Sequence, residues 1–244
     1  MKNEKAKVRK EYIYLDSKKG IVNVLVCKPS QNSKIGFGFV VQTYHFSIEQ
    51  VQNLDFKSDL ANCLNCPYSF SSNTELSGKC YTHKGLQKLG LNSMLKRLNK
   101  NKESYTEFNN THFLQFMDYV NKVKPILVRF GAYGEPVLMD FNVVDSFNKY
   151  RSTGYTHNWR NTETAETFTT KFMASVHTIK EKEQANKLGF RTFRVINKDD
   201  QSNTVKNEIN CPASKESGLN KTCIECGLCN GFVKKMKNIY INVH

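Results

Sequence analysis

Seven of the eight cysteines in this 244-residue chain fall into two groups with the short spacing of metal ligands. The first group is the C-x2-C pair Cys63 and Cys66, followed after thirteen intervening residues by Cys80. Three thiolates can hold an iron–sulfur cluster with one iron left open, or they can close a tetrahedral zinc site if His83 supplies a fourth ligand. The sequence therefore predicts a metal centre here and leaves its metal open.

The second group contains four cysteines, Cys211 and then Cys223, Cys226 and Cys229 at C-x2-C-x2-C spacing. Four thiolates complete a metal site without another ligand. Consecutive two-residue gaps are typical of ferredoxin-type loops, so the spacing favours an iron–sulfur cluster, with structural zinc as the alternative. The two groups could form one shared site or two. The eighth cysteine, Cys27, lies in an apolar run, and we expect it to be a buried core residue.

Other candidate site residues follow apolar runs that predict strands. The sequence GAYGEP contains Gly134, Glu135 and Pro136, where glycine lets the backbone approach a ligand and the carboxylate can bind one. Strand carboxyl ends are the usual place for sites in α/β folds. If the later strand ends converge there, we predict that four side chains contact a substrate: His157, Ser175, His177 and Arg194.

Period-two alternation decides which neighbours share a strand face. It places His157 on one face with Tyr155 and Trp159, and Ser175 with His177 on one face of the next strand. A site at these strand ends would therefore include both histidines.

The elements that must position these residues alternate between short strands and helices. Sequence pattern predicts strands at 21–27, 37–44, 125–133, 153–159, 171–177 and 191–196, and helices at 86–98, 113–123, 141–150 and 179–189. Strands alternating with helices require right-handed crossovers and a parallel sheet. We predict an α/β fold, as a partial or complete (β/α) barrel with cysteine-rich metal-binding loops. A flat doubly wound sheet is the alternative, but no GxGxxG favours it.

Composition indicates a globular chain and excludes collagen, coiled coil and complete disorder, with 39% hydrophobic and 11% aromatic residues. We divide it into a basic leader with the first strand (1–35), a barrel-like domain carrying the first cysteine group (36–205) and a cysteine-rich metal-binding segment (206–244). No apolar run approaches the roughly 20 residues of a membrane span, and no apolar stretch follows the charged amino terminus. We expect no membrane partner and a reducing, cytoplasmic location.

The formal charge of +14 is concentrated in residues 1–34 and 79–102. These stretches are candidates for contacts with nucleic-acid phosphates, although solvated faces have the same composition. No helix-turn-helix, paired-histidine zinc finger or aromatic stacking motif accompanies them. The sequence does not indicate an oligomeric state.

The motif order RFGAYGEP, TGYTHNW, MASVH, LGFRTFRV, CPAS and TCIECGLCNG resembles an uncharacterised family of bacteriophage and plasmid proteins related to the gene product 88 domain. The resemblance covers residues 36–231. It implies a protein of a phage or another mobile element, located in the cytoplasm of the host cell.

A looser resemblance is to radical S-adenosylmethionine (SAM) enzymes, which combine a three-cysteine cluster loop, an aromatic residue beside one of those cysteines and a Gly-Gly-Glu-Pro turn that grips the methionine amine. The resemblance implies a 4Fe–4S cluster on the first cysteine group beside Tyr81, and SAM held by 133–136. It also implies an auxiliary cluster on the second group. The chain departs from that family in its C-x2-C-x13-C spacing and in Tyr133, which replaces a glycine.

Two functions follow as hypotheses. The first is a radical SAM-like iron–sulfur enzyme of a mobile element, acting on a nucleic-acid-related substrate. The second is a zinc- or cluster-stabilised nucleic-acid-binding protein of phage or plasmid replication, without catalysis.

Overall fold

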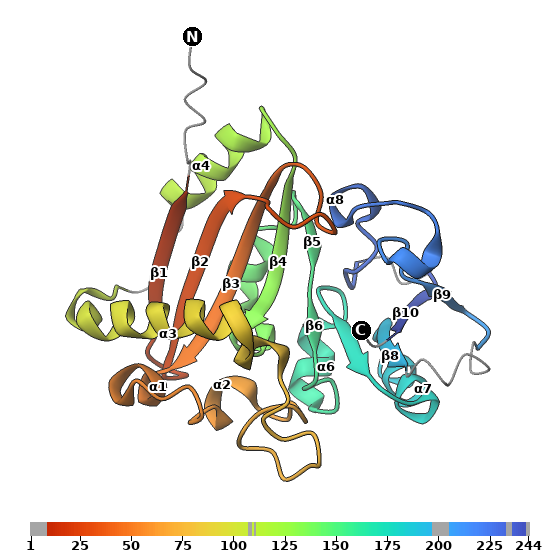
Figure 1. Cartoon of the computed structure of the whole chain (residues 1–244), viewed down its shortest axis with the longest axis horizontal. Helices are drawn as coiled ribbons and strands as arrows, with labels where there is room; N and C mark the ends of the chain where they lie inside the picture. The colour runs from red at the N-terminus through yellow and green to blue at the C-terminus, as the bar shows by residue number, and fades with distance from the viewer. Residues whose placement is uncertain (1–8, 107–108, 110, 197–204, 233–235, 243–244) are drawn as a thin grey trace.

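The protein has a mixed α/β fold, and its described residues form two five-stranded sheets, both rich in parallel strands (Figure 1). This computed structural model describes residues 9–106, 109, 111–196, 205–232 and 236–242. The first sheet has the order β1-β2-β3-β4-β5, with β1 to β3 antiparallel and β3 to β5 parallel. Its strands are β1 (Lys10–Asp16), β2 (Ile21–Pro29), β3 (Phe39–Ser47), β4 (Ile126–Tyr133) and β5 (Arg151–Thr153).

The second sheet is parallel throughout and has the order β6-β7-β8-β10-β9. Only Gly154 separates β5 from the first strand of this sheet, so the chain passes there from one sheet to the other. The strand nearest the carboxyl terminus, β10, inserts between β8 and β9. Its strands are β6 (Tyr155–Thr156), β7 (Met173–Val176), β8 (Thr192–Ile196), β9 (Glu208–Asn210) and β10 (Asn238–Asn242).

Helices connect these strands, and several begin at a side-chain cap. Ser47, Thr178 and Thr222 each form a capping box at the start of a helix, which satisfies backbone N–H groups that the helix leaves free. The helices are α1 (Ile48–Asn53), α2 (Leu60–Cys63), α3 (Gly85–Lys100), α4 (Thr111–Asn121), α5 (Phe141–Asp145), α6 (Thr162–Phe168), α7 (Ile179–Lys187) and α8 (Cys223–Cys226). Short 3-10 turns add η1 (Tyr81–His83), η2 (Lys102–Ser104), η3 (Pro136–Leu138) and η5 (Lys215–Ser217).

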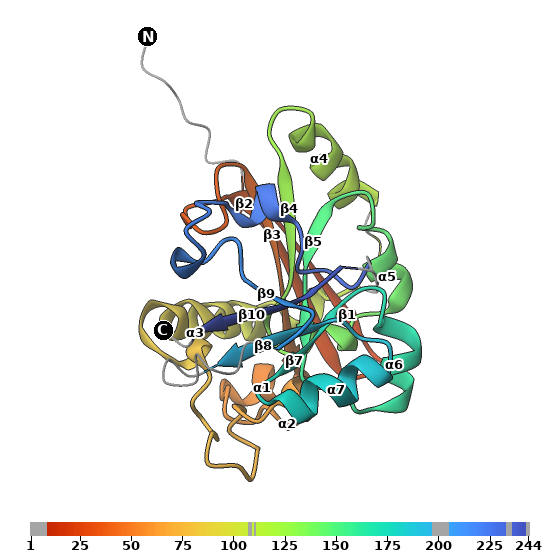
Figure 2. The same ribbon diagram turned by 90° about the vertical axis from the view of Figure 1, so that its right-hand side faces the viewer.

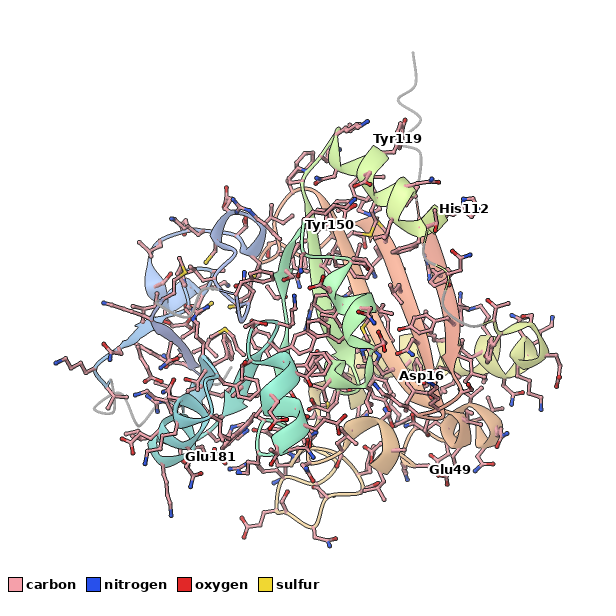
Figure 3. The ribbon with its side chains drawn as sticks, turned by 180° about the vertical axis from the view of Figure 1, so that it is seen from behind. Asp16, Glu49, His112, Tyr119, Tyr150 and Glu181 are labelled. Carbon is pink, nitrogen blue, oxygen red and sulfur yellow. The ribbon has the colours of Figure 1, made fainter. Side chains whose placement is uncertain are left out.

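The first sheet is covered on both faces. Val24 of β2 packs in one cluster with Leu95 of α3, whereas Leu25 packs in another with Met117 of α4. Helix α3 crosses in front of β1 to β3 in Figure 1, and α4, with its labelled His112 and Tyr119, lies on the opposite side in Figure 3. Burial of both faces explains why β2 is almost continuously apolar.

Most of the predicted elements are confirmed. The strands expected at 21–27 and 37–44 are β2 and β3, and the helices expected at 86–98 and 113–123 are α3 and α4. Parallel pairing from β3 onward and the α/β class are also confirmed. The described strands are hydrogen-bonded as two sheets, and the barrel stays a prediction.

The structure also adds and shortens elements. Sequence pattern missed β1, α6, β9 and β10, and the strand expected at 153–159 is divided at Gly154 and ends at Thr156. The leader's β1 and β2 belong to the same sheet as β4. Residues 1–8 of the leader and residues 197–204, at the expected boundary near 205, lie outside the described residues. Within the described residues, no helix has both the length and the apolar character of a membrane span.

Candidate functional site

A cavity of about 480 Å³ opens at the carboxyl ends of β4, β6 and β7 and brings together most of the predicted site residues. This volume falls in the usual range for small-molecule sites. We call it the cysteine cavity. Its lining includes Cys63, Cys66, Cys80, Tyr81, Gly134, Glu135, His157, Ser175 and His177.

The loop that carries the first cysteine group is folded around a buried carboxylate. Asp59 is fully buried, and it accepts hydrogen bonds from the backbone N–H of Phe70 at 2.7 Å and of Ser71 at 2.9 Å. The Cys63 N–H donates to the Asp59 carbonyl at 2.8 Å, and the Cys66 N–H donates to the Cys63 carbonyl at 3.0 Å. Asp59 therefore fixes the chain on both sides of the C-x2-C pair.

Asn62 ties this loop to the turn after β4. Its side-chain Nδ2 donates to the His45 carbonyl at 2.9 Å, and its own carbonyl accepts the Glu135 N–H at 2.7 Å. The approach is so close that a Cβ on Gly134, whose φ is +75°, would lie 2.7 Å from the His45 carbonyl oxygen. Glycine is therefore required at 134 by both backbone conformation and space. No local sequence pattern identifies Asn62, because its partners are distant in the chain.

Glu135 and His157 form a buried pair at the wall of the cavity. The Glu135 carboxylate accepts from Thr156 Oγ1 at 2.6 Å and from the His157 N–H at 2.9 Å, and it lies 3.4 Å from His157 Nδ1. Burial lowers the pKa of His157, but hydrogen bonds and charge from Cys66 and Glu135 outweigh it and raise that pKa to about 10. His157 therefore lies between Glu135 and a cysteine of the first group.

His177 lies beside His157 on the next strand. The two imidazole rings are stacked with centroids 5.9 Å apart, and Tyr68 Oη lies 3.4 Å from His177 Nδ1. Burial and the neighbouring His157 lower the pKa of His177. Ser175, one of the cavity-lining residues, is buried, and its carbonyl accepts the Trp159 indole N–H at 3.1 Å. The cavity is therefore lined by two imidazoles whose pKa values are shifted in opposite directions.

Cys80 and Tyr81 close the other side of the cavity. Cys80 Sγ lies 3.0 Å from Thr82 Oγ1, and the Tyr81 hydroxyl donates to the Ala132 carbonyl at 3.4 Å. Burial raises the pKa of the Cys63 and Cys80 thiols. A bound metal ion would offset the cost of deprotonating these buried thiols, because a cation stabilises thiolates.

Tyr133, which stands where radical SAM enzymes have glycine, lines the cavity. Its side chain is buried, Gln50 Nε2 donates to its hydroxyl at 2.8 Å, and its ring centroid lies 5.0 Å from that of Phe46. Pro136 follows Glu135 and begins η3, where it packs against Gly131.

Three residues singled out in the sequence lie elsewhere. Arg194 is buried on the face of β8 opposite to the cavity-lining Phe193 and forms a 2.6 Å salt bridge with Glu208. His83 stacks on Phe70 at 4.5 Å and does not line the cavity. Trp159 is buried in a separate apolar cluster, so the face shared by Tyr155 and His157 does not extend to it.

The second cysteine group is anchored by backbone hydrogen bonds to distant segments. The Cys223 N–H donates to the Lys34 carbonyl and the Cys211 N–H to the Tyr240 carbonyl, both at 2.8 Å. Arg191, which precedes β8, donates to three backbone carbonyls of the loop, at Leu228, Asn230 and Lys237. The pKa values of the Cys211, Cys223 and Cys229 thiols are raised chiefly by burial and in part by the charges of other thiols of the group, Cys226 included. The four thiols therefore lie near one another.

The helices that carry cysteines of the two groups lie at opposite ends of the first sheet. Helix α2, which ends at Cys63, follows the carboxyl end of β3. The Cys223 N–H at the start of α8 donates to the carbonyl of Lys34, which precedes the amino end of β3. Figure 1 and Figure 2 show α2 and α8 at opposite ends accordingly.

Tyr155 connects the second group to the cysteine cavity. It lines that cavity, and its phenol hydrogen-bonds to the Cys229 thiol. The Cys229 pKa is raised to about 12, chiefly by burial. The remaining cysteine, Cys27, is fully buried in the main core, as predicted.

The thiols of both cysteine groups are chemically suitable ligands for metal clusters. Three thiols that line an open cavity can each bind a different iron and leave a fourth iron for a ligand. The second group offers four thiols, two buried and two partly exposed. As they stand, no three His, Cys, Asp or Glu side chains of the described residues are close enough to hold a single metal ion.

Comparison of the chain with protein-family models, curated proteins and solved structures gave no match. The two resemblances therefore rest on the motifs themselves, and the function must be argued from the site.

Proposed function

We propose that this protein is a radical SAM-like iron–sulfur enzyme, with a 4Fe–4S cluster on Cys63, Cys66 and Cys80. The observation that carries the proposal is the cysteine cavity. It places three thiols, from a loop after β3, against the turn at the carboxyl end of the neighbouring parallel strand β4. A cluster ligated there by three cysteines would have its open iron directed to a space that can hold a small molecule.

Different residues of the chain would have different roles in such a site. The backbone at Tyr133 and Gly134 would bind the methionine end of SAM, and the Asn62 carbonyl holds that turn in place. When bound, the cluster and SAM supply one-electron chemistry that begins a radical reaction. Ser175 and His177 line the part of the cavity left for a substrate, and Tyr81 lines its other side.

The proposal includes a partial (β/α) barrel. Strands β3, β4, β5/β6, β7 and β8 follow one another in chain order and are parallel, with a helix in most of the connections. In α/β barrels the carboxyl ends of such strands form the active site. The cysteine cavity lies at those ends.

The second cysteine group would hold an auxiliary cluster. Four thiols complete its ligation, and Tyr155 contacts both this group and the cysteine cavity. This contact through Tyr155 suits a structural or electron-transfer role. The resemblance to phage and plasmid proteins supports assignment to a mobile element and a nucleic-acid-related substrate.

Anaerobic purification tests the proposal. We expect a brown protein with iron and acid-labile sulfide, and we expect Cys66→Ala to lose a large part of both. Cys27→Ala is the matched control, because this buried thiol belongs to neither group, and it should retain both. A colourless wild-type protein with stoichiometric zinc would contradict the proposal and favour the nucleic-acid-binding alternative.

A further inference from the structure

A second cavity, of about 510 Å³, adjoins the cysteine cavity. Its walls come from β2, β3 and β4 on one side and from α3 and η1 on the other. The two cavities share the lining residues Tyr81, Thr82, Arg129 and Ala132, so they meet at the Tyr81 side chain. A ligand in one can therefore reach the other past this ring.

The second cavity is basic. Four cationic side chains line it, Arg9, Lys28, Arg97 and Arg129, and no acidic side chain does. Arg97 is paired with Glu11 at 2.6 Å, and the same carboxylate lies 3.3 Å from Arg9. One carboxylate thus serves two of the four cations. We call this space the basic cavity.

Lys28 and Arg129 are left without an acidic partner. Within the described part of the chain, neither forms a salt bridge, and Arg129 donates a hydrogen bond to the Tyr81 hydroxyl at 2.9 Å. Burial and the nearby Arg9 lower the pKa of Lys28. A charge that is partly desolvated and faces another cation is costly unless an anion occupies the space between them.

The placement of Arg129 relates this charge to the cysteine cavity. Its guanidinium lies at the junction of the two cavities, near the phenols of Tyr44, Tyr81 and Tyr155 and near the Cys223 thiol of the second group. A planar guanidinium donates two parallel hydrogen bonds to a phosphate, and its fixed geometry orients the bound group. An anion held by Arg129 would be oriented toward both spaces.

We propose that the basic cavity binds a phosphate group of the substrate, with Lys28 and Arg129 as its principal ligands. A phosphate fits this set better than a carboxylate, because it carries more charge and has three acceptor oxygens for cations on two sides. The assignment of the bound molecule as a substrate rests on the proposed function, because its remainder would reach past Tyr81 to the first cysteine group. The substrate is then a phosphate ester, supplied either by a free nucleotide or by a nucleic-acid strand.

Binding measurements on the full, iron-loaded chain test this inference. The probes are inorganic phosphate, adenosine monophosphate and a short single-stranded oligonucleotide, titrated at low salt by calorimetry. Lys28→Gln and Arg129→Gln should each weaken phosphate and nucleotide binding by about tenfold or more, as expected for loss of a charged hydrogen bond. Lys96→Gln, an exposed residue of α3 outside the cavity, makes the same charge change and should leave binding unaltered.

The outcomes separate the sources and the two proposals. Tighter binding of the oligonucleotide, lost in the same two variants, assigns the phosphate to a strand, and preference for the mononucleotide assigns it to a small molecule. Equal binding in all three variants, or no phosphate binding at low salt, overturns the inference. Lys28 lines the basic cavity but not the cysteine cavity. SAM binding by Lys28→Gln therefore tests the cysteine cavity independently of phosphate binding. A wild-type protein that binds phosphate but does not bind SAM would refute the proposed function and would still support the anion site.

Discussion

Replacement of Gly134 by alanine should destabilise the protein by about 3 kcal/mol. An alanine in the left-handed backbone region costs about 1–2 kcal/mol. The new Cβ would also lie 2.7 Å from the His45 carbonyl oxygen and 3.1 Å from that of Asn62. These oxygens cannot withdraw freely, because one accepts from Asn62 and the other from Glu135. Overpacking of this kind typically adds about 1–3 kcal/mol.

Urea unfolding at pH 7 measures the change, with Gly90→Ala as the matched control. Gly90 lies within α3, has ordinary helical backbone and has no neighbouring atom within 4 Å of the position that an alanine methyl group would take. The same substitution there should stabilise the protein by about 0.5–1 kcal/mol, because alanine loses less conformational entropy in a helix. A Gly134→Ala variant as stable as the wild type would refute the close contact between the first cysteine loop and the turn after β4.

The remaining predictions concern buried charge. Burial, and then the charge of Lys19, lower the pKa of His45 to about 3. The unfolded chain therefore binds a proton below pH 6.5 that the folded chain excludes, and stability present above pH 6.5 is lost as the pH falls toward 3. The difference in unfolding free energy between the wild type and His45→Gln should fall by about 2 kcal/mol from pH 7 to pH 5, and a constant difference would contradict this. Arg194→Met should lower the free energy of unfolding by about 3–5 kcal/mol, because it leaves Glu208 buried and unpaired. The double variant with Glu208→Leu should recover a large part of that lost stability. SAM binding by folded Arg194→Met should equal the wild type, and a selective loss of binding would show that Arg194 acts at the site.

The periodic elements could be predicted because their signal is local. Helix α7 has a capping Thr178 and ends before Gly189, and β4 is a mainly apolar run with Arg129 as its one charged residue. The missed strand β10 is only five residues long and is stabilised by β8 and β9 on its two sides, which no window of sequence contains. Strand β1 has a short run of aromatic and aliphatic residues, YIYL, flanked by charged residues in a basic segment, and that charge concealed it.

The candidate site could be predicted in its residue types but not in its geometry. Cys63, Glu135 and His157 line one cavity as the motifs suggested. Alternation along β8 puts Arg194 and Phe193 on opposite faces, but sequence alone does not say which face lines the cavity. The hydrogen bonds of Asn62 to His45 and Glu135 join three distant segments, so their role emerges only in the folded chain.

The most direct test of the account is the spectrum of the anaerobically purified, reduced protein with and without SAM. Binding of SAM at the open iron should change the electron paramagnetic resonance signal of the first cluster, and SAM should be cleaved. Cys66→Ala should lose both effects, and Cys27→Ala should retain them. An iron-containing wild-type protein whose spectrum does not change with SAM and that leaves SAM intact would contradict the central claim.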